Sequence, residues 1–243
     1  MKAILSYYKL IFILLIIAIL GLGGYVWYWE FRKPLLEAYF FQLERGRSVF
    51  IRTPHNETVL IDGGQNSEIL REITKVLPFY RRRIDTVIVT SSMPKNVGGL
   101  SDVVKRYNVG RVIESELMGT STALTVFHKS WNKEIVKVKK GDEFIIDGVK
   151  FKVLFPDPLF KYNKTSFPEL VLGIEYGDTR LLLLGDVSKT IQKRLIPEVG
   201  KINVVEYAHG GAESRVSADL FEKIKPESIV NSKREGTVYF SFK

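Results

Sequence analysis

The chain has 243 residues, enough for one sizeable core plus an appendage, and its hydrophobic (45%) and charged (26%) contents exclude wholesale disorder. It contains no cysteine, which excludes disulfides, thiolate metal sites and a cysteine nucleophile. The net charge of +9 suits an anionic partner such as nucleic acid or a lipid headgroup, although a solvated basic surface explains it equally well.

The first distinctive stretch is an uncharged run of twenty residues, Leu10 to Trp29. An apolar helix of this length crosses a hydrocarbon core of about 30 Å, and aromatic residues at both of its ends are typical of an interfacial belt. We therefore predict a membrane anchor over residues 1–33, with one transmembrane helix at about 10–29. A cleaved signal peptide is the alternative, but the apolar run is long for one. The flanking positive charges do not decide the orientation.

Residues 34–243 show no linker and predict one domain. Strand patterns alternate with helical patterns in both halves, which indicates two packed sheets with helices on their outer faces. The predicted strands are 37–43, 48–51, 58–61, 85–89, 111–113, 136–138, 144–146, 150–154, 170–176, 180–184, 203–207, 228–231 and 237–242. The predicted helices are 66–77, with Asn66 as cap, 98–107, 120–131, 188–195 and 217–224. Asp147-Gly148 and Gly177-Asp178 predict hairpin turns.

The β-branched run that ends at Val89 leads into a polar loop, and Gly98-Gly99 then open an amphipathic helix. A strand that runs into a loop and a helix N-terminus is a common place for α/β proteins to build a site. We therefore expect the working pocket of this chain between Thr90 and Leu100.

This stretch resembles the signature of the metallo-β-lactamase superfamily, whose strand ends in T-H-x-H-x-D-H-x-G-G. The scaffold letters are kept as Thr90, Gly98 and Gly99. The four metal-binding positions instead hold Ser91, Met93, Lys95 and Asn96. The sequence thus looks like a hydrolase fold that has lost its metal ligands.

Further stretches resemble the β-lactamase-like domain of ComEC-type DNA-uptake proteins. A family segment like F-L-D-V-G-Q-G-D is matched by residues 40–47, where Gln42 and Arg47 take the places of its two acids. The L-I-D-x-G strand end is kept at residues 60–64, and the H-H-G-S motif appears as residues 208–211. The resemblance implies a four-layer αββα sandwich, here preceded by one transmembrane helix, with the domain facing away from the cytoplasm.

Few of the family's metal ligands remain. Asp186 matches its carboxylate and His209 its histidine, whereas His55 lies in a predicted turn and His128 in a predicted helix. Catalytic zinc takes three protein ligands, and the ammonium of Lys95 would repel a dication. We therefore predict no metal site, no zinc or other cofactor and no catalytic residues.

What remains is a vestigial pocket that predicts a ligand site. Its candidate residues are Lys95, Asn96, Asp186 and His209. The helix N-terminus at Gly98-Gly99 would add backbone N–H groups that favour phosphate. Simpler interpretations stay open: Asp186 caps the next helix, Asp62 is structural, and His209 anchors its loop.

We predict a single-pass protein of the cell membrane that is not a hydrolase and binds nucleic acid or another anionic partner in DNA uptake. Two alternatives stay open. One is a metal-dependent hydrolase or phosphodiesterase with an atypical site. The other is a protein-interaction subunit that docks on a membrane partner. The run Arg81 to Arg83 fits a solvated turn or a contact with nucleic acid.

Overall fold

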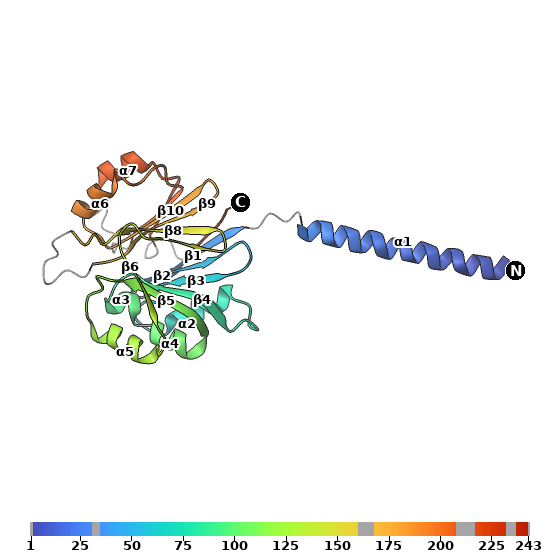
Figure 1. The fold of residues 1–243 in the computed structure, drawn as a ribbon, viewed down its shortest axis with the longest axis horizontal. Helices are drawn as coiled ribbons and strands as arrows, with labels where there is room; N and C mark the ends of the chain where they lie inside the picture. The colour runs from blue at the N-terminus through green and yellow to red at the C-terminus, as the bar shows by residue number, and fades with distance from the viewer. Residues whose placement is uncertain (1, 31–34, 160–167, 208–216, 232–236, 243) are drawn as a thin grey trace. The chain divides into compact units, whose positions relative to one another are not determined.

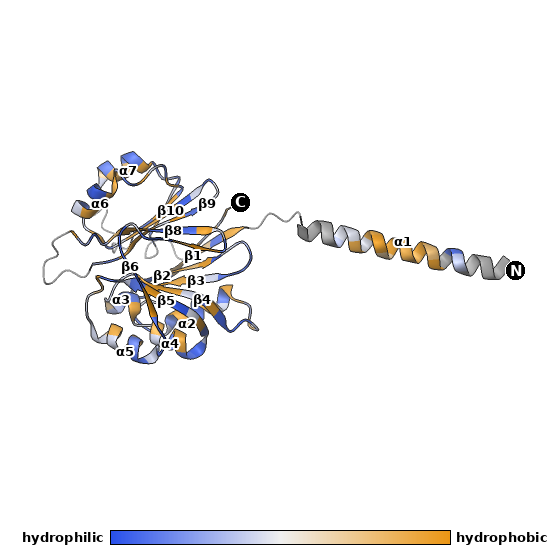
Figure 2. Cartoon of the chain, in the orientation of Figure 1, coloured by the Kyte–Doolittle hydropathy of each residue, from blue (hydrophilic) through white to orange (hydrophobic). Residues whose placement is uncertain are grey.

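A computed structural model describes residues 2–30, 35–159, 168–207, 217–231 and 237–242. The chain divides into two compact units, one from Met1 to Pro34 together with Lys243, and one from Leu35 to Phe242. The first contains α1 (Lys2–Glu30), whose described apolar side chains are exposed around the whole helix. In Figure 2 the middle of this helix is mostly orange, the colour of hydrophobic residues. Within the described residues, no helix is both long enough and apolar enough to cross a membrane.

The second unit contains two sheets. The seven-stranded sheet has the order β13-β1-β2-β3-β4-β5-β6, and the six-stranded sheet has the order β12-β11-β10-β9-β8-β7 (Figure 1). The first is built from β1 (Leu36–Gln42), β2 (Arg47–Arg52), β3 (Thr58–Ile61), β4 (Arg83–Val89), β5 (Asn108–Ser115), β6 (Ile135–Val138) and β13 (Val238–Phe242). The second is built from β7 (Glu143–Ile146), β8 (Val149–Phe155), β9 (Val171–Tyr176), β10 (Thr179–Gly185), β11 (Val204–Tyr207) and β12 (Ser228–Val230).

Helices cover the outer face of each sheet. Against the seven-stranded sheet lie α2 (Glu68–Val76), α3 (Pro94–Val97), α4 (Leu100–Arg106) and α5 (Thr122–Ser130). Against the six-stranded sheet lie α6 (Lys189–Leu195) and α7 (Ala218–Ile224). Figure 1 shows α2 to α5 on one side of the paired sheets and α6 and α7 on the other.

Three clusters of buried apolar side chains hold these layers together. The first lies between the sheets and joins residues such as Phe40 and Ile51 to Phe151 and Leu172. The second packs the outer face of the seven-stranded sheet on its helices, and the third does the same for the six-stranded sheet. Strands with both faces covered need apolar side chains on both, which is why β3 is buried along its whole length. The predicted αββα sandwich is therefore confirmed for this unit.

Most predicted elements agree with the structure within one or two residues. The strand predicted at 111–113 is longer, because β5 spans Asn108–Ser115 as the parallel partner of β4. Asn66 does not occupy the cap position of α2, which belongs to Ser67, although its Oδ1 accepts a hydrogen bond from the Glu68 N–H at 3.0 Å. The helix that we expected to open at Gly98-Gly99 is preceded by the short helix α3.

The strand directions give the seven-stranded sheet two functionally different edges. β1 and β3 both run antiparallel to β2, and β3, β4 and β5 are parallel to one another. One edge, the strand-start edge, therefore holds the first residues of β1, β3, β4 and β5 and the last residue of β2. The opposite edge, the strand-end edge, holds Asp62 after β3 and Thr90 after β4, where family signatures led us to expect the site.

Candidate functional site

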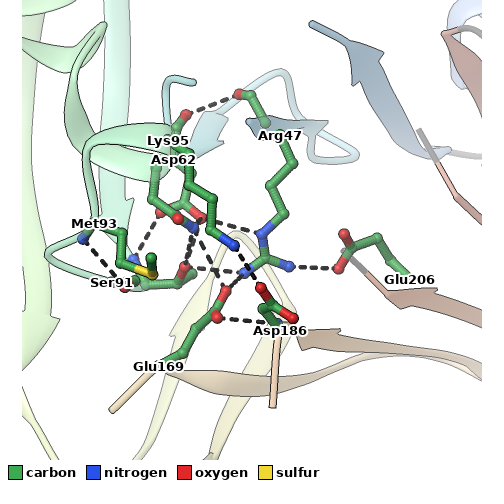
Figure 3. A network of polar contacts seen from close by, with 11 residues as sticks. Arg47, Asp62, Ser91, Met93, Lys95, Glu169, Asp186 and Glu206 are labelled. Carbon is green, nitrogen blue, oxygen red and sulfur yellow. Dashed lines mark hydrogen bonds and ion pairs between the residues drawn. The ribbon is translucent and has the colours of Figure 1, made fainter. Parts of the chain in front are cut away.

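Side chains from both sheets meet at the strand-end edge, around the guanidinium group of Arg47 (Figure 3). Arg47 is the first residue of β2, and its side chain is buried. From the same sheet come Asp62 and Thr90, while Glu169 and Glu206 come from the six-stranded sheet and the segment that leads into it. The site thus lies where the ends of the two sheets face each other.

Arg47 bridges three buried carboxylates. Its Nη1 lies 2.7 Å from Glu206 Oε2, its Nε lies 3.5 Å from Asp62 Oδ2, and its Nη2 forms an ion pair with Glu169 Oε1. Nη2 also donates a hydrogen bond to Thr90 Oγ1 at 3.1 Å. A planar guanidinium with five N–H donors suits such a cluster, because it can serve several acceptors at once.

Asp62 is held from the other side by the loop after β4. Its Oδ1 accepts a hydrogen bond from the Thr90 N–H at 2.8 Å, and its Oδ2 accepts from Thr90 Oγ1 at 2.5 Å and from Asn96 Nδ2 at 2.7 Å. The backbone of Asp62 has φ = 61°, in the left-handed region that non-glycine residues rarely adopt. These hydrogen bonds to Thr90 and Asn96 hold Asp62 in this conformation.

The charges in the cluster do not balance, since one guanidinium faces three carboxylates. Burial raises the pKa of Asp62 to about 6, against the opposing effect of Arg47. Burial also raises the pKa of Glu206, and again Arg47 opposes the shift. Burial acts to lower the pKa of Arg47, but the negative charges of the three acids outweigh it and hold that pKa above its usual value. Arg47 is therefore charged, and burial favours the protonated forms of Asp62 and Glu206.

Two glycines make room for this arrangement. A Cβ on Gly185, which has φ = 62°, would lie 2.6 Å from Arg47 Nη2 and would overlap the Glu169 carboxylate. A Cβ on Gly46, which has φ = 100°, would overlap the carbonyl oxygen of Lys95. Gly46 therefore lets the chain pass close to α3 immediately before Arg47 turns inward.

A second ion pair lies beside the first. Lys95 Nζ is 2.5 Å from Asp186 Oδ2, and both side chains are partly exposed. The Asp186 N–H donates to Glu169 Oε2 at 2.9 Å, so this outer pair is connected to the Arg47 cluster through Glu169. Figure 3 shows the Lys95 side chain pointing toward Asp186.

The structure brings three of the four predicted pocket residues together. Lys95 and Asp186 form the ion pair, while Asn96 is buried and turned toward Asp62 instead of toward solvent. His209 lies outside the described residues. The interpretation of Asp186 as a helix cap is wrong, because α6 starts at Lys189 with Ser188 in the cap position.

The backbone N–H groups of Gly98 and Gly99, which we expected to face an anion, bond within the chain. The Gly99 N–H bonds to the Gly64 carbonyl oxygen at 3.1 Å, and the Gly98 N–H bonds to that of Pro94 at 2.9 Å. A Cβ on either glycine would overlap backbone oxygens of the segment from Gly63 to Asn66. The two glycines therefore serve close backbone packing, and their N–H groups are already used.

The two described histidines pair with acids other than Asp186. His55 Nδ1 pairs with Asp147 at 2.5 Å, in the β2–β3 turn on the strand-start edge. His128, on α5, pairs through Nε2 with Glu114 at 2.8 Å. In the described part of the chain, no group of three His, Cys, Asp or Glu side chains is arranged to hold a metal ion.

A metal ion also fits poorly with the charges that are present. The carboxylates of Asp62, Glu169 and Glu206 face Arg47, and Asp186 faces Lys95. Two buried acceptor atoms, Asn96 Oδ1 and Glu206 Oε1, have no hydrogen-bond partner among the described residues, but zinc takes at least three protein ligands. The described residues therefore do not fit a metal centre.

Three central residues of the cluster escaped prediction as site residues: Arg47, Glu169 and Glu206. The family resemblance marks Arg47 only as the replacement of an acid. Glu206 stands alone among apolar neighbours in β11, and Glu169 directly precedes the apolar run that starts at Leu170. A charged residue within or beside a buried strand requires a partner of opposite charge. Such positions in the sequence therefore indicate a buried ion pair.

This combination of two facing sheets, outer helices and a polar site at the strand ends is the metallo-β-lactamase fold. Solved structures agree. YhfI from Bacillus subtilis, described as a metallo-β-lactamase fold protein, matches with a TM-score of 0.56 and 11% identity, covering 85% of this chain and 100% of its own. A metallo-β-lactamase with a HARLDQ motif from Cronobacter sakazakii matches with a TM-score of 0.51 and 15% identity, over 75% of this chain and 76% of its own.

Among curated proteins, the chain is similar to Recombination protein 2 of Haemophilus influenzae, with 22% identity over 176 residues. The match covers 71% of this chain and 20% of that protein, so the chain corresponds to a small part of its relative's length. No family model matches the chain.

Proposed function

We propose that this chain is a membrane-anchored, non-hydrolytic protein of the metallo-β-lactamase fold, in which side-chain cations replace the metal. The observation that carries the proposal is Arg47, whose guanidinium bridges Asp62, Glu169 and Glu206. In a hydrolytic member of this fold, a dication would neutralise the acids and activate water. Arg47 neutralises part of that charge, but a guanidinium cannot act as a Lewis acid toward bound water.

Metal content tests this proposal directly. The full-length chain, purified in detergent without chelator and dialysed against zinc or manganese, is expected to retain far less than one ion per molecule. The Arg47→Asp variant, which restores an acid at that position, serves as the comparison. Stoichiometric metal in the unmodified chain, together with metal-dependent phosphodiesterase activity, would overturn the proposal in favour of an atypical hydrolase.

Membrane anchoring by α1 is supported by the chemistry of its surface. The described apolar side chains from Phe12 to Leu22 are exposed on all sides of the helix, and such a helix requires an apolar environment. The uncharged run from Leu10 to Trp29 has the length of a membrane span. We expect the chain to float with membranes after alkaline carbonate extraction; release into the soluble fraction would contradict the anchor.

Nucleic acid is the partner that we propose for the second unit. The support is the similarity to Recombination protein 2, the resemblance to ComEC-type proteins and the basic charge of residues 34–243, which carry +6 of the chain's +9 because residues 1–33 hold four basic residues against one acid. Contact with a DNA backbone is independent of sequence and weakens steeply with salt. In a filter-binding titration of the full-length chain, we expect affinity for single- or double-stranded DNA to fall at least tenfold between about 50 and 200 mM salt. An absence of salt-sensitive binding would favour a subunit that docks on a membrane protein.

A further inference from the structure

The segment between α2 and β4 presents two neighbouring aromatic rings to solvent. Phe79 is 91% exposed and Tyr80 is 74% exposed. Their ring centroids lie 5.5 Å apart at an angle of 82°, so each ring covers only part of the other. Adjacent aromatic side chains with this much exposed apolar area are unfavourable in water unless another surface covers them.

Basic side chains surround these rings, and two of them are not neutralised. Arg81 and Arg83 share Asp85, with N–O distances of 3.0 and 2.6 Å. Arg82 and Arg106 are exposed and form no ion pair with any described residue. Together with Phe79 and Tyr107, these two arginines line a surface hollow of about 180 Å³. The patch formed by Phe79, Tyr80, Arg82 and Arg106, here called the aromatic–basic patch, is thus both apolar and cationic.

The aromatic–basic patch lies at the strand-start edge, the same edge at which the chain enters the second unit at β1. A chain of contacts links the two points, since Arg52 pairs with Glu37 of β1 at 2.7 Å and also donates to the carbonyl oxygen of Val76, at the end of α2. β1 and β4 are three strand spacings apart, which is about 14 Å. The start of β1 and the patch are therefore close neighbours on one face of the unit.

The covalent connection to α1 is short. α1 ends at Glu30 and β1 begins at Leu36, and six residue steps span at most about 21 Å. If α1 is anchored in a bilayer, as the proposed function requires, then the strand-start edge is confined to the neighbourhood of the bilayer surface.

We propose that the aromatic–basic patch docks on the surface of an anionic bilayer. Phe79 and Tyr80 would enter the headgroup region, where aromatic side chains are favoured, and Arg82 and Arg106 would contact lipid phosphates. This inference rests on the proposed anchoring of α1. Nucleic acid shares the phosphate chemistry, but the position of the patch beside the anchored end of the unit favours lipid. The docking would turn the strand-end edge, with Lys95 and Asp186, away from the membrane.

The absence of cysteine allows a clean test with single labels. Pro78→Cys places a fluorophore beside the two rings, and Glu116→Cys places one on an exposed residue at the strand-end edge as control. The full-length labelled chain is reconstituted into vesicles of phosphatidylcholine with or without phosphatidylglycerol, each containing a headgroup-level quencher. Insertion of α1 is scored separately by flotation after carbonate extraction.

We expect quenching at position 78 in the anionic vesicles, weaker quenching in the neutral ones, and none at position 116. Replacement of Phe79 and Tyr80 by serine should abolish this quenching, and loss of each arginine should weaken the contact about fivefold.

A chain that floats with the vesicles but is quenched no more at position 78 than at position 116 would overturn the docking and leave the membrane anchor standing. Chain that does not float would overturn the anchor and the docking with it. A label at 78 that responds to single-stranded DNA and not to lipid would overturn the lipid assignment.

Discussion

Arg47 decides the electrostatics of the candidate site, because it is the cation that meets all three buried acids. A buried charge without a partner is far less stable than a buried pair, so each member of the cluster depends on the others. The role of these residues in holding the two sheets together is therefore best tested through stability.

Replacement of Arg47 by alanine should lower the free energy of unfolding by about 3–5 kcal/mol, because three buried carboxylates lose their counter-charge. Urea denaturation followed by circular dichroism measures the effect. Arg45→Ala, two residues away and exposed, is the matched control and should change stability by less than about 0.5 kcal/mol. Equal small effects for both variants would show that the Arg47 cluster does not stabilise the fold.

Asp62 predicts a specific pH dependence. Its pKa in the folded protein is raised to about 6, so the folded state binds this proton more tightly than the unfolded state. The contribution of Asp62 to stability is thus present in full below about pH 4 and is lost as the pH rises through about 6. The stability difference between the unmodified chain and Asp62→Asn should shift toward the variant by on the order of 2 kcal/mol from pH 4 to pH 7. A constant difference across that range would contradict the raised pKa.

Gly185 predicts a steric effect that can be separated from backbone strain. Gly185→Ala combines a positive φ with overlap of the Arg47–Glu169 ion pair, whereas a Cβ on Gly177, with φ = 55°, meets nothing within 4 Å. Both alanine variants should lose about 1–2 kcal/mol from the left-handed backbone, and Gly185→Ala should lose at least a further 1–3 kcal/mol from the crowding. Thermal melts of the two variants measure the difference; equal losses would show that the site has room at Gly185.

Among the secondary-structure elements, the N-terminal caps of α5 and α6 differ in whether they contact the site. Ser121 caps α5, since its Oγ accepts a hydrogen bond from the Leu124 N–H at 3.0 Å, and it also donates to the carbonyl oxygen of Ser92 in the site loop. Ser188 occupies the same position at α6 without a side-chain cap bond. The first serine thus joins a helix to the site loop, and the second has no such role.

Ser121→Ala should therefore cost about 1 kcal/mol or more, the usual value of a lost cap. Ser188→Ala should change the free energy of unfolding by less than about 0.5 kcal/mol. Chemical denaturation of the two variants in parallel measures the difference. A loss at Ser188 as large as that at Ser121 would contradict the hydrogen bonding described here.

At the scale of the whole molecule, the second unit contains its own complete core. The three apolar clusters begin at Leu36 and draw no described residue from α1. A fragment starting at Pro34 should therefore unfold cooperatively, with a midpoint within about 5 °C of that of the full-length chain in the same detergent. Calorimetry of both proteins measures this. A fragment that is unfolded or melts far lower would show that α1 supports the fold.

Sequence patterns were sufficient for the sandwich because they report on local geometry. Alternating and continuous apolar runs located the strands, and turn residues such as Asp147-Gly148 located the hairpin between β7 and β8. The short helix α3 was missed because its four residues carry no periodicity. The packing of Gly98 and Gly99 against the backbone of residues 63–66 was missed because contacts between distant parts of the chain leave no local pattern.

Residue types and their spacing are enough to predict the layers of the second unit and to show how few metal-binding side chains are kept at the family's ligand positions. The side chains that meet at the strand-end edge, in contrast, depend on how the two sheets pack. Arg47 is 122 positions from Glu169 and 159 positions from Glu206, and it meets them because two sheets pack face to face. Charge pairing over such separations leaves no periodic trace in the chain, so the guanidinium at the centre of the site became visible only in the folded molecule.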